Sequence, residues 1–180
     1  AQKINQVPFY IANGLSQGIM PLISYNYASD NIKRMKHTLT FAAKISVTGL
    51  VLVSIAYSFF AGDLITMFMD NPEIVEMGSR FLRGFCLGLP FLCVDFLAVG
   101  VFQASGLGRN ALVFAILRKI VLEIPALFIL NYFFPLYGLA YAQFTAELVL
   151  SIAAVIILVK LFGKLELEKA DRDAQKAQKA

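Results

Sequence analysis

The chain has 180 residues and a net charge of +4; 58% of its residues are hydrophobic and only 16% are charged. An average soluble domain has about a quarter charged residues, so this composition excludes an ordinary soluble protein and indicates one surrounded mostly by lipid. The lysines and arginines lie in short segments between apolar stretches and at the C-terminus, without interleaved aromatic residues. This pattern excludes a nucleic-acid-binding surface.

The N-terminal third contains two predicted membrane-spanning helices. Residues 3–29 form the first, because the stretch between Lys3 and Asp30 has no formal charge and is long enough to cross a hydrocarbon core of about 30 Å. A basic loop at 31–37 separates it from the second helix, over about 39–62. An acidic, turn-forming stretch at 63–76 ends the second helix.

Three further helices are predicted, over about 78–105, 111–134 and 139–162. We expect the first turns of the helix at 111–134 to be interfacial, because that helix carries several charged residues. The tail at 163–180 is rich in Lys, Glu, Asp, Ala and Gln, so it is predicted to be a charged, solvated segment, with a frayed helix as an alternative. The predicted fold class is an all-α polytopic membrane helix bundle with about five spans.

Basic residues in the loops predict the orientation, because cytoplasmic loops are enriched in lysine and arginine. Three segments on one side carry them: Lys33, Arg34 and Lys36; Arg109; and Lys160, Lys164 and Lys169. The other side has the acidic stretch 63–76, although Arg80 and Arg83 are exceptions there. We expect a multi-pass protein of the plasma or inner membrane with a cytoplasmic C-terminus.

The first predicted helix has one polar face. Its members recur at spacings of seven, four and seven: Gln6, Asn13, Gln17 and Ser24. Polar side chains are costly against lipid, so this face is either a seam with another helix or the wall of a water-filled cavity.

Two of the predicted helices carry glycines four residues apart, followed by a proline. The first set is Gly14, Gly18 and Pro21, and the second is Gly84, Gly88 and Pro90. The glycine spacing predicts close helix packing, and the prolines, together with Pro125 in the fourth helix, predict bends that could change shape. For each of these residues the alternative is that it only packs against a neighbouring helix and takes no part in a change of shape.

Two carboxylates lie inside predicted spans. Asp95 falls within about 40° of the face that carries Gly84 and Gly88, so it points into the bundle. Glu147 continues a polar stripe between Gln143 and Ser151. Intramembrane carboxylates mark ion pathways or proton relays, and the alternative is a protonated acid that only bonds a neighbouring helix.

The remaining reactive residue types suggest no catalytic or metal site. Glu123 is explained by an ion pair with Lys119, four residues earlier. His37 is the only histidine, and Cys86 and Cys93 are too far apart on one helix for a disulfide. Without a metal-ligand spacing or a nucleotide-binding or nucleophile motif, the sequence predicts neither an enzyme nor a cofactor.

The most specific motif runs from Gly14 to Ala28 and reads GLSQGIMPLISYNYA. With the basic segment that follows, it closely resembles the eighth helix of multidrug and toxic compound extrusion (MATE) transporters. Shorter segments look similar to later helices of that family in the same order: FQASGLG at 102–108, LEIP at 122–125, YGL at 137–139 and AEL at 146–148. The resemblance covers about residues 1–162.

The resemblance implies part of a twelve-helix, two-lobed antiporter that exports small cationic, amphipathic compounds in exchange for Na⁺ or H⁺ by alternating access. This chain would supply helices eight to twelve. Its partners would be the seventh helix and the first lobe of the same transporter, together with membrane lipid. No cofactor besides the coupling ion is implied. The candidates for the substrate and ion pathway are Asp95, Glu147, Asn13, Gln17 and Gln103.

The chain departs from the family pattern at the acids. In one branch, a cation-binding aspartate of the tenth helix lies about two turns before a small residue; aligned on Gly100, that position is Leu92, and Asp95 lies about a turn nearer. Glu147 stands at the acidic position of the twelfth helix. Two alternatives stay open: a lipid-linked oligosaccharide flippase, whose cavity should be more basic, and a non-transporting membrane partner, which needs no buried carboxylates.

Overall fold

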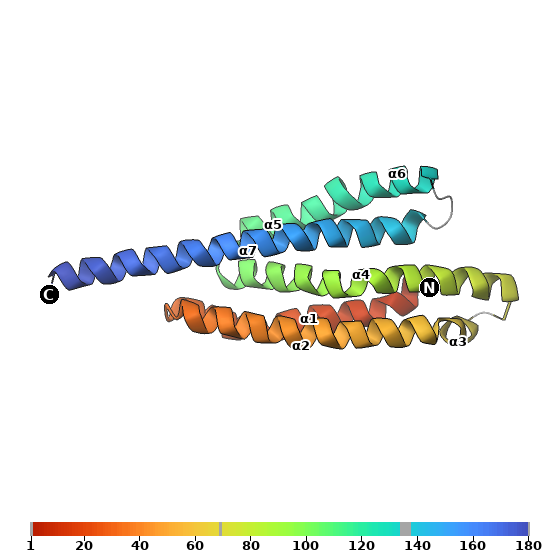
Figure 1. The fold of residues 1–180 in the computed structure, drawn as a ribbon, viewed down its shortest axis with the longest axis horizontal. Helices are drawn as coiled ribbons and strands as arrows, with labels where there is room; N and C mark the ends of the chain where they lie inside the picture. The colour runs from red at the N-terminus through yellow and green to blue at the C-terminus, as the bar shows by residue number, and fades with distance from the viewer. Residues whose placement is uncertain (1, 69, 134–137, 180) are drawn as a thin grey trace.

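The computed structural model describes residues 2–68, 70–133 and 138–179, and every regular element in these ranges is a helix. The helices are α1 (Gln2–Ala28), α2 (Ile32–Phe59), α3 (Ala61–Thr66), α4 (Pro72–Ala104), α5 (Gly108–Ile116), η1 (Leu117–Glu123), α6 (Ile124–Phe133) and α7 (Gly138–Lys179). The π-helix η1 joins α5 to α6 without a break. The long helices run in alternating directions along a common axis (Figure 1).

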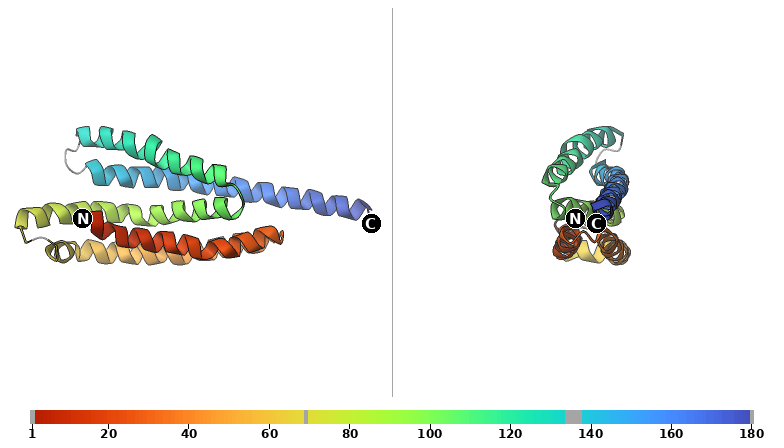
Figure 2. Two further views of the ribbon diagram at one scale, coloured as in Figure 1. Left: turned by 180° about the vertical axis from the view of Figure 1, so that it is seen from behind. Right: turned by 90° about the vertical axis from the view of Figure 1, so that its left-hand side faces the viewer.

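Helix α4 is the centre of the bundle. It contacts α1, α2 and α3 on one side and α5 and α7 on the other (Figures 1 and 2). In its most apolar stretch 67% of the residues are buried, against 22% in α2 and 28% in α7. Large side chains of α4 that are fully buried include Leu82, Leu89, Leu92, Val101 and Phe102. A helix this apolar on all sides requires neighbours around its whole circumference.

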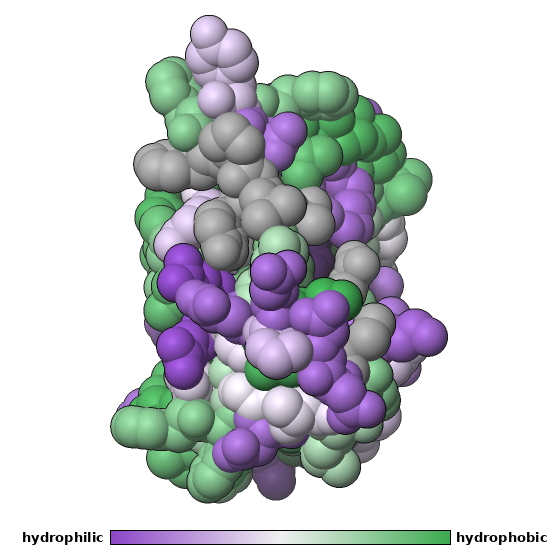
Figure 3. Space-filling model, turned by 90° about the vertical axis from the view of Figure 1, so that its right-hand side faces the viewer, coloured by the Kyte–Doolittle hydropathy of each residue, from purple (hydrophilic) through white to green (hydrophobic). Residues whose placement is uncertain are grey.

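The outside of the bundle suits lipid. Three helical segments are long and apolar enough to cross a membrane: α2, α4 and residues Tyr141–Ala177 of α7. Large hydrophobic side chains cover the surface; Phe41, Phe59, Phe128, Tyr132 and Val159 are each more than half exposed. Figure 3 views the end where α4 begins, and there hydrophilic residues gather between hydrophobic flanks. The predicted fold class, an all-α membrane helix bundle, is confirmed.

Two of the five predicted spans are not among these three segments. Helix α1 has 27 residues, enough to cross a bilayer at about 1.5 Å per residue, but it carries the polar face described above. The helical run at 108–133 is divided by η1.

The ends of two helices differ from the sequence prediction. Helix α2 begins directly after Asn31, whose side chain accepts a hydrogen bond from the Arg34 N–H at 3.2 Å. The basic segment predicted as a loop therefore forms the first turns of α2. Helix α4 begins directly after Asn71, which accepts from the Glu73 N–H at 3.0 Å. The acidic stretch predicted as a turn is therefore partly helical, and α3 occupies its first part.

Helix α7 continues to Lys179, so the tail, predicted as a solvated segment with a frayed helix as an alternative, is helical in its described part. The extension projects beyond the bundle (Figures 1 and 2). Asp30, at the end of α1, anchors it: Lys169 Nζ donates to the Asp30 carbonyl at 2.9 Å, and Arg172 pairs with the Asp30 carboxylate at 2.7 Å. The Arg172 pair is solvent-exposed and contributes little free energy.

Helices α1 and α4 come close together at Gly100. A Cβ atom there would lie 2.6 Å from Ser16 Oγ, which donates a hydrogen bond to the Phe96 carbonyl oxygen at 2.6 Å. Gly14 and Gly18 meet no neighbouring helix within the described residues, because both are exposed and a Cβ atom at either would meet nothing within 4 Å, so the close packing expected there stays a prediction. Small residues bring helices together only on a face that meets a neighbour, and α1 turns its Ser16 face toward α4.

We expect Gly100→Val to lower the free energy of unfolding by about 1–3 kcal/mol, because the new side chain overlaps Ser16 Oγ and displaces its hydrogen bond. The measurement is thermal unfolding of the detergent-solubilised protein. Gly49→Val is the matched control, since a Cβ atom at Gly49 meets nothing within 4 Å. Equal midpoints for the two variants would contradict the close α1–α4 contact.

Candidate functional site

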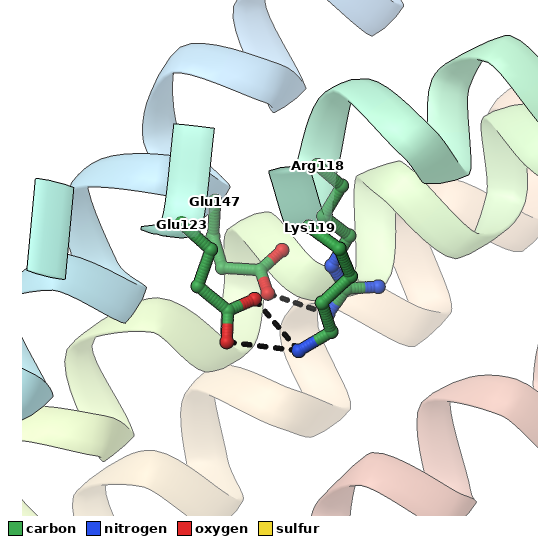
Figure 4. A network of polar contacts seen from close by, with 4 residues as sticks. All are labelled: Arg118, Lys119, Glu123 and Glu147. Atoms are coloured by element: carbon green, nitrogen blue, oxygen red, sulfur yellow. Dashed lines mark hydrogen bonds and ion pairs between the residues drawn. The ribbon is translucent and has the colours of Figure 1, made fainter. Parts of the chain in front are cut away.

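A cluster of charged side chains is buried among α4, η1 and α7. Asp95 on α4 and Glu147 on α7 are each 1% exposed. Arg118 of η1 donates from Nη2 to Glu147 Oε1 at 2.5 Å, and its side chain is 15% exposed. Figure 4 shows Glu147 and Arg118 meeting between their helices. Charged side chains are almost never this buried without a role in pairing or binding, so this cluster is the candidate functional site.

Helix α7 packs against α4 beside Gly88, near Glu147. A Cβ atom at Gly88 would lie 3.6 Å from Phe144 Cα and 3.8 Å from Glu147 Cγ, so the two helices pack closely at this residue. Gly84, one turn earlier, is also buried. Asp95, two turns after Gly88, points into the bundle as the helical spacing predicts.

The π-helix η1 positions Arg118. It ends just before the helical residue Pro125, which has no N–H to donate and whose ring opposes the carbonyl of Val121, four residues earlier. The Ile124 N–H instead donates to the Lys119 carbonyl, five residues back, as in a wider π-turn. Such turns are frequent at functional sites, and this one carries Arg118 toward α7.

Arg118 is the one member of the cluster that the sequence analysis did not single out. The expectation that the first turns of this helix are interfacial stays a prediction, but Arg118 faces the bundle: it lies against α4 and α7 with its Cζ 5.3 Å from the centroid of the Phe96 ring. One signal was available: the Lys119–Glu123 pair assigns the exposed face of the helix, and Arg118 is about 100° away from Lys119 around the axis. The guanidinium is stabilised by both the carboxylate and the aromatic face.

The predicted pair of Lys119 and Glu123 is confirmed. Lys119 Nζ donates to the two carboxylate oxygens at 2.7 and 2.8 Å, and the lysine side chain is 65% exposed. Figure 4 shows this pair beside the buried one. The two charges neutralise each other at the surface, so they contribute no net charge to the cluster.

The buried cluster has more hydrogen-bonding atoms than it satisfies. Both carboxylate oxygens of Asp95, Oε2 of Glu147 and Nε of Arg118 are buried, and within the described residues they have no hydrogen-bond partner. Asp95 interacts electrostatically with both Glu147 and Arg118. When both acids are ionised, two carboxylates beside one guanidinium give the cluster a net charge of one negative unit. The Asp95 carboxylate is therefore suited to accept a proton or a monovalent cation.

The other pathway candidates lie apart from the cluster. Gln17 is exposed on α1 and donates to the Asn13 side chain at 3.4 Å, and Gln103 is exposed near the end of α4. Ser24, from the same polar face, instead donates to the Ala104 carbonyl at 3.1 Å and forms a seam with α4. Among the described residues, no hydrogen bond or ion pair joins the three amide side chains to the buried acids.

The helices run without interruption through Pro21 and Pro90. Pro125 differs, because a π-helix ends two residues before it. Bending at these prolines stays a prediction.

Comparison with known proteins places these observations in a family. A protein-family model described as MatE matches residues 1–129. The multidrug export protein MepA of Staphylococcus haemolyticus is 34% identical over 169 residues, which are 93% of this chain and 37% of that protein. MepA of Staphylococcus saprophyticus is 34% identical over 170 residues, covering 94% of this chain and 37% of the relative.

The fold has a counterpart among solved structures. The Vibrio cholerae MATE transporter VcmN in its bent form superposes with a TM-score of 0.86 at 18% identity, over 92% of this chain and 38% of that one. The chain therefore spans little more than a third of the length of the proteins it resembles.

Removing the guanidinium should destabilise the fold. We expect Arg118→Met to lower the free energy of unfolding by about 3–5 kcal/mol, because it leaves the buried Glu147 carboxylate without its counter-ion. Lys119→Met on the same π-helix is the matched control and should cost about 1 kcal/mol or less, because its pair is exposed. Chemical unfolding in detergent micelles measures both. Similar losses in the two variants would mean that the Arg118 pair is no more important than a surface pair.

Proposed function

The chain belongs to the MatE family of membrane transporters, and we propose that it forms part of a cation-coupled antiporter that exports cationic, amphipathic drugs and toxic compounds. Export would proceed by alternating access, in exchange for Na⁺ or H⁺. The multidrug export activity named for the MepA relatives supports the substrate class. The coupling to a cation rests on the buried cluster of this chain.

The single observation that carries the coupling is the excess of buried carboxylate. Asp95 and Glu147 are both 1% exposed, and Arg118 balances only one of them. In a membrane interior an ionised, unpaired carboxylate is expensive, so its neutralisation by an incoming cation supplies free energy that can drive a conformational change. We propose this cluster as the coupling site.

The chain would act together with further helices of the same transporter. Because it spans 37% of the length of its relatives, we propose that it supplies helices eight to twelve and that the seventh helix and the first lobe complete the pathway. The amides of Asn13, Gln17 and Gln103 would then line the cavity between the lobes. Gln17 and Gln103 are exposed and Asn13 is partly exposed on apolar helices, which supports this placement, since amides are costly against lipid.

A flippase for lipid-linked oligosaccharides would need a more basic cavity. The buried cluster instead has two acids and one base, which favours a cationic substrate. A membrane partner without transport activity would not need buried carboxylates at all.

In a transporter of the relatives' full length that contains this chain, we expect Asp95→Asn and Glu147→Gln each to reduce efflux of a cationic dye without reducing membrane abundance. Each change removes a carboxylate from the proposed coupling site. Dye accumulation in whole cells and immunoblots of membranes measure the two effects. Glu123→Gln, which alters only the surface pair, is the matched control and should keep efflux near the unmodified level. Unchanged accumulation in both cluster variants would contradict the proposed coupling site.

We also propose that the protein lies in the plasma or inner membrane with its C-terminus in the cytoplasm. A fluorescent protein fused after Ala180 should then fluoresce, and a periplasmic phosphatase fused there should be inactive. Fusions in the acidic stretch at 63–76 should give the opposite pair of results. An active phosphatase after Ala180 would contradict the proposed orientation and indicate the opposite one.

A further inference from the structure

We propose that Arg118 is a fixed internal counter-ion for Glu147, so that Asp95 alone binds the coupling ion and the cluster accepts one positive charge at a time. This inference rests on the proposed function, whose coupling site it divides into a permanently neutralised acid and an exchangeable one. The ligand is a single monovalent positive charge that neutralises a carboxylate, either a proton or Na⁺.

The geometry assigns the guanidinium to one acid. Arg118 Nη2 lies 2.5 Å from Glu147 Oε1, whereas no described cationic side chain donates to either Asp95 oxygen, and the group beside Asp95 is the Glu147 carboxyl. The Phe96 ring, 5.3 Å from Arg118 Cζ, gives the guanidinium a second attachment in this position. Since Phe96 follows Asp95 directly on α4, Arg118 stays near Asp95 while bonding only Glu147.

Glu147 and Asp95 differ in whether the positive charge that neutralises them can be exchanged. A guanidinium keeps its positive charge throughout the physiological pH range and bonds carboxylates in a rigid fork, so the Arg118–Glu147 pair is neutral in every transport state in which it persists. Asp95 has no such partner. Among the described residues, the Cys93 thiol on the same helix also interacts electrostatically with Asp95, and it brings no positive charge.

Among the described residues, no further ion pair brings a positive charge to the cluster. Lys119 and Glu123, on the same π-helix, already pair with each other at the surface. Helix α1 contributes the hydroxyl of Ser16, which is bonded to the Phe96 carbonyl. Neutralising the cluster therefore takes one cation, and Asp95 is where it binds.

A specific pattern of variants follows. Glu147→Gln removes the partner of Arg118 and leaves the guanidinium free to pair with Asp95, which then cannot take up the coupling ion. Removing both charges, as in R118Q/E147Q, leaves Asp95 as it is in the unmodified protein. The double variant should therefore regain the binding of the coupling ion that E147Q loses. Adding R118Q to D95N should not restore ion binding.

The decisive experiment measures ion binding in the full-length transporter that contains this chain, without using transport. Thermal unfolding in detergent is followed in NaCl against choline chloride at constant ionic strength, and separately across a pH series. The unmodified protein and R118Q/E147Q should show a rise in midpoint of about 3–5 °C with the coupling ion, because a ligand that binds only the folded state stabilises it. E147Q should need about tenfold more ion for the same rise, and D95N should show none. A response in the NaCl series identifies the coupling ion as Na⁺, and a response in the pH series identifies it as H⁺.

The proposal is overturned if E147Q responds to the ion as the unmodified protein does, or if R118Q/E147Q does not regain the response. If E147Q does not fold, the comparison of R118Q/E147Q with D95N/R118Q/E147Q decides, because only the former should respond. R118K should keep the response, since a lysine preserves the counter-charge, and K119Q/E123Q is the control for changing a neighbouring pair. Dye efflux is measured in parallel: absent efflux with an intact ion response would reject the exporter and leave the role of Arg118 standing.

Discussion

The ion pair between Arg118 of η1 and Glu147 of α7 lies against α4, the central helix of the bundle. Glu147 approaches α4 beside Gly88, and Arg118 approaches Glu147 from the π-helix that lies before Pro125. In an apolar interior neither charge is tolerable without the other, so the pair constrains the packing of α7, η1 and α4 at once. Asp95, close by and without a hydrogen-bond partner among the described residues, depends on this arrangement for its electrostatic surroundings.

Helix α4 links this pair to the rest of the bundle. The same helix meets α7 at Gly88 and α1 at Gly100, and its side chains are largely buried between these contacts. Without a hydrophobic effect between lipid-facing helices, close approach at small residues and hydrogen bonds such as that from Ser16 to the Phe96 carbonyl provide the association. A site on α4 is therefore sensitive to the positions of both neighbouring helices.

Much of the fold could be predicted because its causes are local. Apolar length identifies membrane helices, and 3.6-residue periodicity turns Asp95 inward with Gly88. The Lys119–Glu123 pair also depends only on spacing within one helix. The helix starts at Asn31 and Asn71 were missed because the charges beside them suggested loops, whereas an asparagine cap stabilises a helical first turn regardless of those charges.

The amino-acid sequence by itself determined the membrane class, the inward face of α4 and the family, because composition, periodicity and a contiguous motif are properties of the chain alone. Only the tertiary structure decided that Ser16 and Gly100, and not Gly14 and Gly18, bring α1 to α4, and that Arg118 turns from the surface to a buried acid. These are contacts between helices far apart in the chain. Their choice depends on the rotation of each helix about its axis, which the spacing of residues within one helix cannot specify.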